Sequence, residues 1–181
     1  ELERMKKACQ ISADALNVAE ELMKPGVTTK EIDRAIHDYI VKCGAKPSFL
    51  GLYGFPASAC ISVNDVVIHG IPSGYSLKPG DIVSVDVGAT IDGYHGDNAY
   101  TFAVGDISEE VASLLRVTQE SLYKGIEAAV VGNRIGDISF AVQSHVTPYG
   151  YGIVRRPGQN PEKRQPILNI PLPSQKMGRS S

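Results

Sequence analysis

The sequence lacks an apolar run of the roughly 20 residues that a membrane-spanning helix needs, so we expect no membrane span. It also lacks an excess of positive charge. The formal net charge is -2, which excludes a broad basic face for DNA or other nucleic acid. Cysteine is scarce, and Cys9, Cys43 and Cys60 form an odd set at irregular spacing that favours reduced thiols over a disulfide framework. Because the N-terminus shows no signal-peptide pattern, we expect a cytoplasmic protein.

The overall composition is typical of a globular protein with one sizeable core. The chain has 181 residues, of which 43% are hydrophobic and 21% are charged. Apolar residues at steps of three and four predict a helix over residues 2–23, which Pro25 ends. A second helix is predicted to begin at Thr28, which can form a capping box with Glu31. Gly44 is the predicted C-terminal cap of that helix.

The hydrophobic period changes between residues 58 and 105, where β-branched and aromatic residues form short runs separated by turn pairs. Three or four antiparallel strands are predicted there. Two further helices should follow, capped by Ser108 and Asp137. This order of elements favours an α+β fold. The residues predicted to face inward on the last two helices are Val111, Leu114, Leu115, Leu122, Ile126, Ile138, Ala141 and Val142.

The two helical regions resemble each other. The segments that match without gaps, at an offset of 106 residues, are "PGVTTKEIDRAIHDYIVKCG" and "VGNRIGDISFAVQSHVTPYG". Two short helices can also look alike by chance. If the repeat is real, the strands at 58–105 should have counterparts at 164–211, a range that extends past the 181 residues given.

The last 26 residues have a different composition. Residues 156–181 hold five of the eleven prolines and five basic side chains against the single acid Glu162. Proline removes a hydrogen-bond donor from a strand ladder, so this density cannot build interior strands. We therefore predict a domain over residues 1–155, followed by an irregular, basic, proline-rich tail over residues 156–181.

Two aspartates flank a predicted hairpin turn in the stretch "SVDVGATIDGYHGDNAYTF". A two-residue loop at Asp92-Gly93 sets a register in which Asp97 faces Gly88, whose bare backbone should leave space. Asp86 lies two residues from Gly88 and therefore on the same face. The sequence thus predicts that both carboxylates leave one side of the sheet, unless a bulge breaks the register.

Two like charges held at about 5 to 7 Å repel each other, and a cation would relieve that repulsion. Hard divalent ions favour carboxylate oxygens, and two such ions can share a bridging carboxylate. The alternative is a pair of solvated aspartates on an exposed hairpin. His95 shares the predicted face and is either a further ligand or a solvated side chain near the turn.

Four motifs then occur in a fixed order: "VNDVVIHGIP", "LKPGDIVSVDVG", "DGYHGD" and "GDISFAVQSHV". From about residue 2 to Arg155 the chain resembles the N-terminal half of a type I methionine aminopeptidase, one of the pita-bread metallopeptidases. The resemblance implies a pita-bread α+β fold and a cytoplasmic hydrolase that removes the initiator methionine from new polypeptides. Its implied cofactors are two divalent metal ions (Co, Mn, Fe or Zn), and its implied partners are N-terminal methionyl peptides and nascent chains.

The same resemblance implies roles for individual residues. Asp86 and Asp97 would bind the metal ions, His69 of the "HGIP" motif would lie beside the scissile peptide, and His95 corresponds to no family ligand. A metal or a donor such as His69 would stabilise the oxyanion formed at the carbonyl. Apolar residues in a loop are also common as ordinary packing. The candidates for the methionine pocket, besides His69, are Phe49, Leu52, Phe55 and Cys60.

The family pattern also requires a histidine and two glutamates from a second half, and residues 156–181 supply neither the histidine nor the glutamate pair. We therefore expect the chain to lack part of the site, to bind metal weakly and to have little activity of its own. An abrupt frameshift or truncation after Arg155 is one hypothesis for the tail. The alternative function is a non-catalytic pita-bread module that binds the ribosome or a nascent chain, and a third is a proline dipeptidase.

Overall fold

The computed structural model describes residues 1–153, which divide into two compact units. The first unit comprises residues 1–107 and the second begins at Ser108. The tail predicted over residues 156–181 lies outside the described residues. None of the helices within residues 1–153 is long and apolar enough to cross a membrane.

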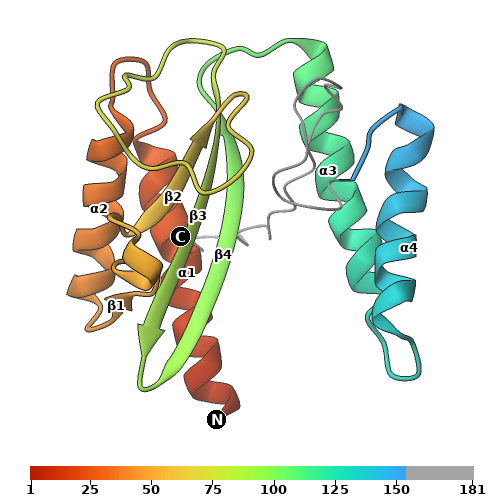
Figure 1. The fold of residues 1–181 in the computed structure, drawn as a ribbon, viewed down its shortest axis with the longest axis horizontal. Helices are drawn as coiled ribbons and strands as arrows, with labels where there is room; N and C mark the ends of the chain where they lie inside the picture. The colour runs from red at the N-terminus through yellow and green to blue at the C-terminus, as the bar shows by residue number, and fades with distance from the viewer. Residues whose placement is uncertain (154–181) are drawn as a thin grey trace, which may run out of the picture. The chain divides into compact units, whose positions relative to one another are not determined.

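The first unit begins with two helices, α1 (Leu2–Glu21) and α2 (Thr29–Lys42), coloured red to orange in Figure 1. The predicted capping box is confirmed: the Glu31 amide donates to Thr28 Oγ1 at 3.2 Å, and the Thr28 amide donates to Glu31 Oε2 at 2.7 Å. Gly44 follows α2 with a φ of 73°, the left-handed conformation expected of a glycine at that end.

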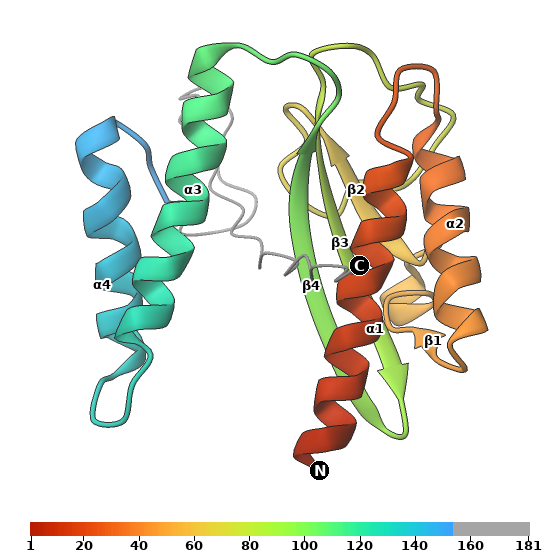
Figure 2. The same ribbon diagram turned by 180° about the vertical axis from the view of Figure 1, so that it is seen from behind.

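Four antiparallel strands form one sheet: β1 (Lys46–Pro47), β2 (Ala59–Val63), β3 (Ile82–Ile91) and β4 (Tyr94–Ala103). A short 3-10 turn, η1 (Leu52–Gly54), lies between β1 and β2. β3 pairs with all three other strands, so it forms the centre of the sheet (Figure 2). The predicted antiparallel strands and the α+β class are confirmed.

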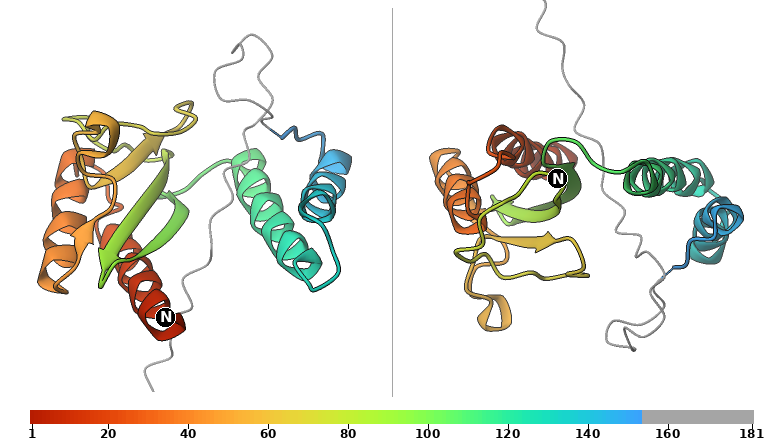
Figure 3. Two further views of the ribbon diagram at one scale, coloured as in Figure 1. Left: turned by 60° about the horizontal axis from the view of Figure 1, so that its bottom comes forward. Right: turned by 90° about the horizontal axis from the view of Figure 1, so that it is seen from above.

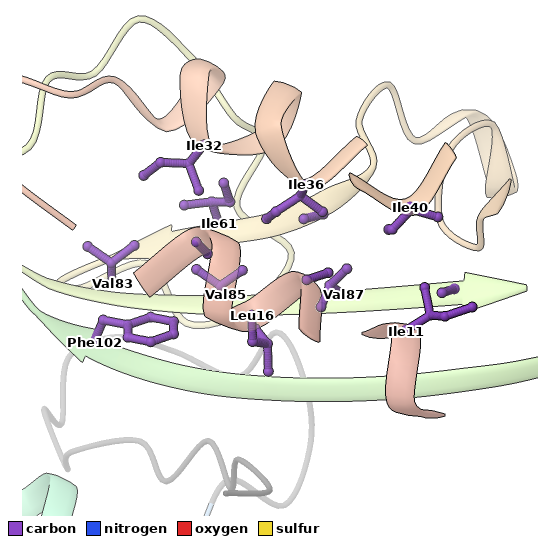
Figure 4. Packing of buried hydrophobic residues seen from close by; sticks show 14 of the residues in the cluster. Ile11, Leu16, Ile32, Ile36, Ile40, Ile61, Val83, Val85, Val87 and Phe102 are labelled. Carbon is purple, nitrogen blue, oxygen red and sulfur yellow. The ribbon is translucent and has the colours of Figure 1, made fainter. Parts of the chain in front are cut away.

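The sheet of the first unit has two different faces, because burial alternates along β3 from Ile82 to Val87. Val83, Val85 and Val87 are fully buried, and the intervening residues, Ser84 and Asp86 among them, are half-buried. The valine face packs against α1 and α2, which lie on the same side of the sheet (Figure 3). Figure 4 shows the resulting core, whose largest members include Leu16, Ile32, Ile36, Ile40, Ile61, Val83, Val85, Val87 and Phe102.

The contact between α1 and β4 depends on Gly96. A Cβ at this position would overlap the backbone of Ala8, so a larger residue would push the helix off the strand. The neighbouring Asn98 ties the same two elements together, because its Nδ2 donates to Ser12 Oγ at 2.6 Å and to the Cys9 carbonyl at 3.2 Å.

The second unit contains α3 (Glu109–Ala128), α4 (Ile135–Val146) and the 3-10 turn η2 (Thr147–Tyr149). Ser108 caps α3 as predicted, accepting from the Val111 amide at 3.3 Å. The prediction that Asp137 caps α4 was wrong. The cap is Arg134, and Asp137 sits three residues further on, where its carboxylate accepts from the Arg134 amide at 2.7 Å.

The buried face of α3 also differs from the prediction. Its buried residues are Val117, Thr118, Ser121 and Gly125, whereas Ile126 is 48% exposed. Thr118 and Ser121 donate their hydroxyls to carbonyls of the preceding turn, which allows these small polar side chains to be buried. The apolar pattern therefore omits Thr118 and Ser121 and wrongly includes Ile126, whereas the predicted Val111, Leu114, Leu115 and Leu122 are half-buried.

The internal repeat reappears in the lengths and positions of the helices. α1 and α3 both have 20 residues, and α4 begins 106 residues after α2, the offset of the matching segments. The strands predicted to follow from residue 164 fall outside the described residues.

Substitution of Gly96 tests the packing of α1 on β4. We expect Gly96→Ala to lower the free energy of unfolding by about 3 kcal/mol, because the added methyl group meets backbone that cannot move aside. Gly74→Ala is the matched control: nothing lies within 4 Å of its Cβ position, and the change should stay within about 0.5 kcal/mol. Urea unfolding followed by circular dichroism measures both, and equal values for the two variants would contradict the packing.

Candidate metal and substrate site

The register of the β3–β4 hairpin is the one predicted from the turn. Asp97 pairs with Gly88, and Asp86 pairs with Ala99 two residues along. Asp92 and Gly93 have φ values of 52° and 83°, the left-handed pair that a tight two-residue turn requires. The ladder continues without a bulge over all ten pairs. Asp86 and Asp97 therefore lie on the face of the sheet opposite α1 and α2.

The two carboxylates are close enough to perturb each other. Burial raises the pKa of Asp86 to about 7, with further contributions from the charge of Asp97 and a hydrogen bond shared with it. Among the described residues, no positively charged side chain contributes to the pKa of Asp86. The donor set therefore fits a divalent cation, which would replace the shared proton and bind oxygens from both side chains.

The donor set is partial within the described residues. In residues 1–153, no group of three or more His, Cys, Asp or Glu side chains is arranged to hold a metal ion. Asp86 and Asp97 can thus contribute two ligands of a larger coordination sphere.

Cys60 lies directly opposite Asp86, on the neighbouring strand β2. Burial raises the pKa of its thiol to about 12, and the negative charges of Asp86, Asp97 and Asp33 add to the shift. Cys60 therefore stays protonated and acts as a small apolar side chain beside the carboxylates.

Asp33 of α2 was not identified from the sequence, and its role is visible only in the fold. One of its oxygens accepts from the backbone amides of Ser58 and Ala59, each at 2.9 Å. These bonds fix the segment that enters β2, immediately before Cys60. A lone aspartate in the middle of an amphipathic helix gives no sequence signal for such a contact.

The space beside Gly88 is filled, which corrects the expectation that it would be open. A Cβ at Gly88 would lie 2.8 Å from both Phe49 Cε1 and Ser48 Cβ. The Ser48 amide also donates to the Gly88 carbonyl at 2.9 Å. The glycine thus allows the Phe49 ring to lie against the strand, next to the position paired with Asp97.

Leu52 and Phe55, the other apolar candidates of this loop, belong to the turn η1 and the residue that follows it. Leu52 is 51% exposed and Phe55 is half-buried. The Gly51 amide donates to the Phe55 carbonyl at 2.8 Å, which closes the turn on itself. Of the four predicted pocket residues, Phe49 and Cys60 are the ones next to the paired positions of Asp86 and Asp97.

His95 is engaged by hydroxyl groups on its own side of the sheet. Its Nδ1 forms hydrogen bonds with Thr90 Oγ1 at 2.8 Å and with Ser48 Oγ at 3.0 Å. These contacts fix the Nδ1 side of the His95 ring.

His69 is exposed in the loop that follows β2 and has a φ of 56°. The next residue, Gly70, is held on the edge of β2: the Ile61 amide donates to its carbonyl at 2.8 Å. A Cβ on Gly70 would overlap the Ile61 carbonyl, so only glycine fits there. Since Ile61 follows Cys60, this anchor brings His69 to the strand that adjoins Asp86.

Comparison with known proteins identifies the family. The chain matches metallopeptidase family M24 over residues 3–164, and it belongs to that family. The matched range extends past Arg155.

The relatives that the chain resembles carry a more specific name. It is 54% identical over 155 residues to the methionine aminopeptidase of Clostridium perfringens, and it spans 62% of the length of that relative. Among solved structures, the methionine aminopeptidase of Rickettsia prowazekii superimposes with a TM-score of 0.83 and 38% identity, over 85% of this chain and 62% of that one. The prolidase of Pyrococcus furiosus gives a TM-score of 0.76 and 26% identity, over 84% and 44%.

The pKa of Asp86 predicts how stability depends on pH when no metal is present. The folded chain keeps a proton on Asp86 that the unfolded chain releases with an ordinary pKa of 3.8. The contribution of Asp86 to stability is therefore fully present below pH 4 and is lost as the pH rises to about 7. Asp97→Asn removes the neighbouring charge and should flatten this fall. Urea unfolding in the presence of a chelator, at pH 5 and pH 8, measures the difference.

The exposed Asp65 offers a matched control for this experiment, because Asp65→Asn removes one carboxylate away from the pair. The loss of stability between the two pH values should be the same in Asp65→Asn as in the unmodified chain. An Asp97→Asn variant that loses as much stability as Asp65→Asn would show that the two carboxylates do not interact.

Proposed function

We propose that the chain carries the first two metal ligands of a methionyl aminopeptidase, which removes the N-terminal methionine from new polypeptides. The observation that supports this most directly is the pair Asp86 and Asp97, held on one face of the sheet and close enough to share a hydrogen bond. The 54% identity to a methionine aminopeptidase points to the same reaction. The substrates would be N-terminal methionyl peptides and nascent chains in the cytoplasm.

Asp86 and Asp97 would hold one or both of two divalent cations, of which Co, Mn, Fe and Zn are the candidates. When bound, these cations would supply Lewis acidity and an activated water molecule for attack on the peptide carbonyl. The remaining ligands would come from water, from residues beyond 153 or from another chain, because residues 1–153 hold no group of three or more ligands. Two carboxylates alone would bind a cation weakly.

His69 would act on the peptide itself. Its imidazole is exposed beside the edge of β2, where a ring N–H can donate to the substrate carbonyl as negative charge develops on the oxygen. A donor held in place before the reaction needs no reorganisation during it. The backbone anchor at Gly70 supports this role for the residue before it.

Phe49 and Cys60 would form part of the pocket for the methionine side chain. The Phe49 ring lies against Gly88, and the protonated Cys60 lies opposite Asp86, so both adjoin the carboxylate pair. A thioether packs well against an aromatic ring and a neutral thiol. Leu52 and Phe55 would complete the apolar wall from the turn η1.

A non-catalytic module that binds the ribosome or a nascent chain is the second candidate. The partial ligand set within residues 1–153 favours it. A proline dipeptidase is less well supported, since the prolidase structure is 26% identical and the methionine aminopeptidase is 54% identical.

Release of methionine from a methionyl-alanyl-seryl peptide distinguishes these functions. The complete product of the gene, supplied with manganese or cobalt, should release methionine and should spare a leucyl-alanyl-seryl peptide. Asp97→Ala should lower the turnover rate by at least about 1000-fold, because it removes a metal ligand whose loss disturbs the whole centre. The same assay on the 181-residue chain measures the activity of this polypeptide alone.

Asp65→Ala is the control for this assay and should retain full turnover. Cleavage of an alanyl-proline dipeptide instead of the methionyl peptide would favour the dipeptidase. Absence of any release by the complete gene product at millimolar manganese and cobalt would contradict the aminopeptidase and leave the binding module.

A further inference from the structure

His69 combines an exposed side chain with a left-handed backbone conformation. Its φ of 56° lies in a region that few non-glycine residues adopt, and asparagine, aspartate and histidine are the most frequent among them. Exposed loops usually open readily, and a conformation of this kind persists where surrounding contacts impose it. The contacts made by the residues that follow His69 therefore help to decide where its imidazole lies.

The first contact is at Ser62 of β2, which is 4% exposed. The Gly70 amide donates to Ser62 Oγ at 3.1 Å, and the Gly70 carbonyl accepts from the Ile61 amide at 2.8 Å. Both polar groups of the residue after His69 are thus bound to one strand. Because Ser62 pairs with Ser84, two positions from Asp86 on β3, this strand is the one that adjoins the carboxylates.

The second contact is at Thr29, the first residue of α2, which is 2% exposed. Thr29 Oγ1 accepts from the Ser73 amide at 2.8 Å and donates to the Ser73 carbonyl at 3.1 Å. One hydroxyl group therefore binds both backbone groups of a residue four positions after His69, and the Lys30 amide also donates to the Ser73 carbonyl at 3.0 Å. The helix that contributes it belongs to the core on the other side of the sheet.

We propose that Thr29 and Ser62 are positioning residues for His69, an inference that rests on the proposed aminopeptidase function. Neither side chain would touch the metal ions or the substrate. Each hydroxyl binds the backbone that follows His69 to a strand or helix of the core, and this would hold the imidazole in position for the substrate carbonyl. Loss of one hydroxyl would leave the loop folded and let His69 move, which lowers turnover more than substrate binding.

The test compares Thr29→Val with Thr29→Ser. Valine keeps the shape of the buried side chain and removes the hydroxyl, whereas serine keeps the hydroxyl. Ser62→Ala provides an independent second variant. Ser76→Ala is the matched control, because the Ser76 hydroxyl also joins this loop to the preceding segment, donating to the Gly26 carbonyl at 2.9 Å, outside the stretch that holds His69.

The first measurement needs no activity. In the 181-residue chain, the ¹⁵N order parameter of the His69 amide should be about 0.85 in the unmodified protein, in Thr29→Ser and in Ser76→Ala. It should fall below about 0.6 in Thr29→Val and Ser62→Ala, with the amides of β3 unchanged. An order parameter that stays at its original value in both of these variants would overturn the proposal.

The second measurement is methionine release by the complete gene product. Thr29→Val should lower kcat on the order of tenfold with KM changed less than twofold, and Thr29→Ser should restore kcat. An unchanged kcat in an active enzyme whose His69 has become mobile would overturn the positioning role and leave the aminopeptidase function standing. An inactive unmodified enzyme would instead contradict the function, while the order parameters still report whether the two hydroxyls hold the loop.

Discussion

The site depends on one electrostatic interaction, the repulsion between the carboxylates of Asp86 and Asp97. The hairpin ladder imposes it, since ten consecutive pairs without a bulge leave both side chains on the same face. Burial intensifies it, because water that would otherwise screen the charges is partly excluded. Such a pair lowers stability at neutral pH, which is consistent with the proposal that the two side chains bind a cation.

The rest of the first unit supports this face. Valines on the odd positions of β3 attach it to α1 and α2, which leaves the even positions free to carry polar chemistry. Phe49 and Cys60 lie beside the strand that carries Asp86, and both come from segments that precede β3 in the chain. Phe49 uses the missing side chain of Gly88, and Cys60 uses the pairing of β2 with β3. His69 reaches the same strand through Gly70.

Structural features that depend on residues close together in the chain could be predicted from the sequence. The capping box at Thr28, the cap at Ser108 and the hairpin register all follow from residues within a few positions of each other, and all are confirmed. The metal and substrate roles of the site residues stay predictions. The pattern failed where packing decides: small polar residues form the buried face of α3, and Phe49 occupies the space beside Gly88. The contact between Thr29 and Ser73 spans 44 residues, so only the folded chain reveals it.

The most direct test is a pH titration of the side-chain carboxyl carbons by ¹³C NMR in the metal-free chain. The account predicts that one carboxyl of the Asp86 and Asp97 pair titrates near pH 7, and that a divalent cation abolishes this titration by displacing the proton. If both carboxyls titrate near pH 4 and a divalent cation leaves them unchanged, the two side chains do not share a site and the account is wrong.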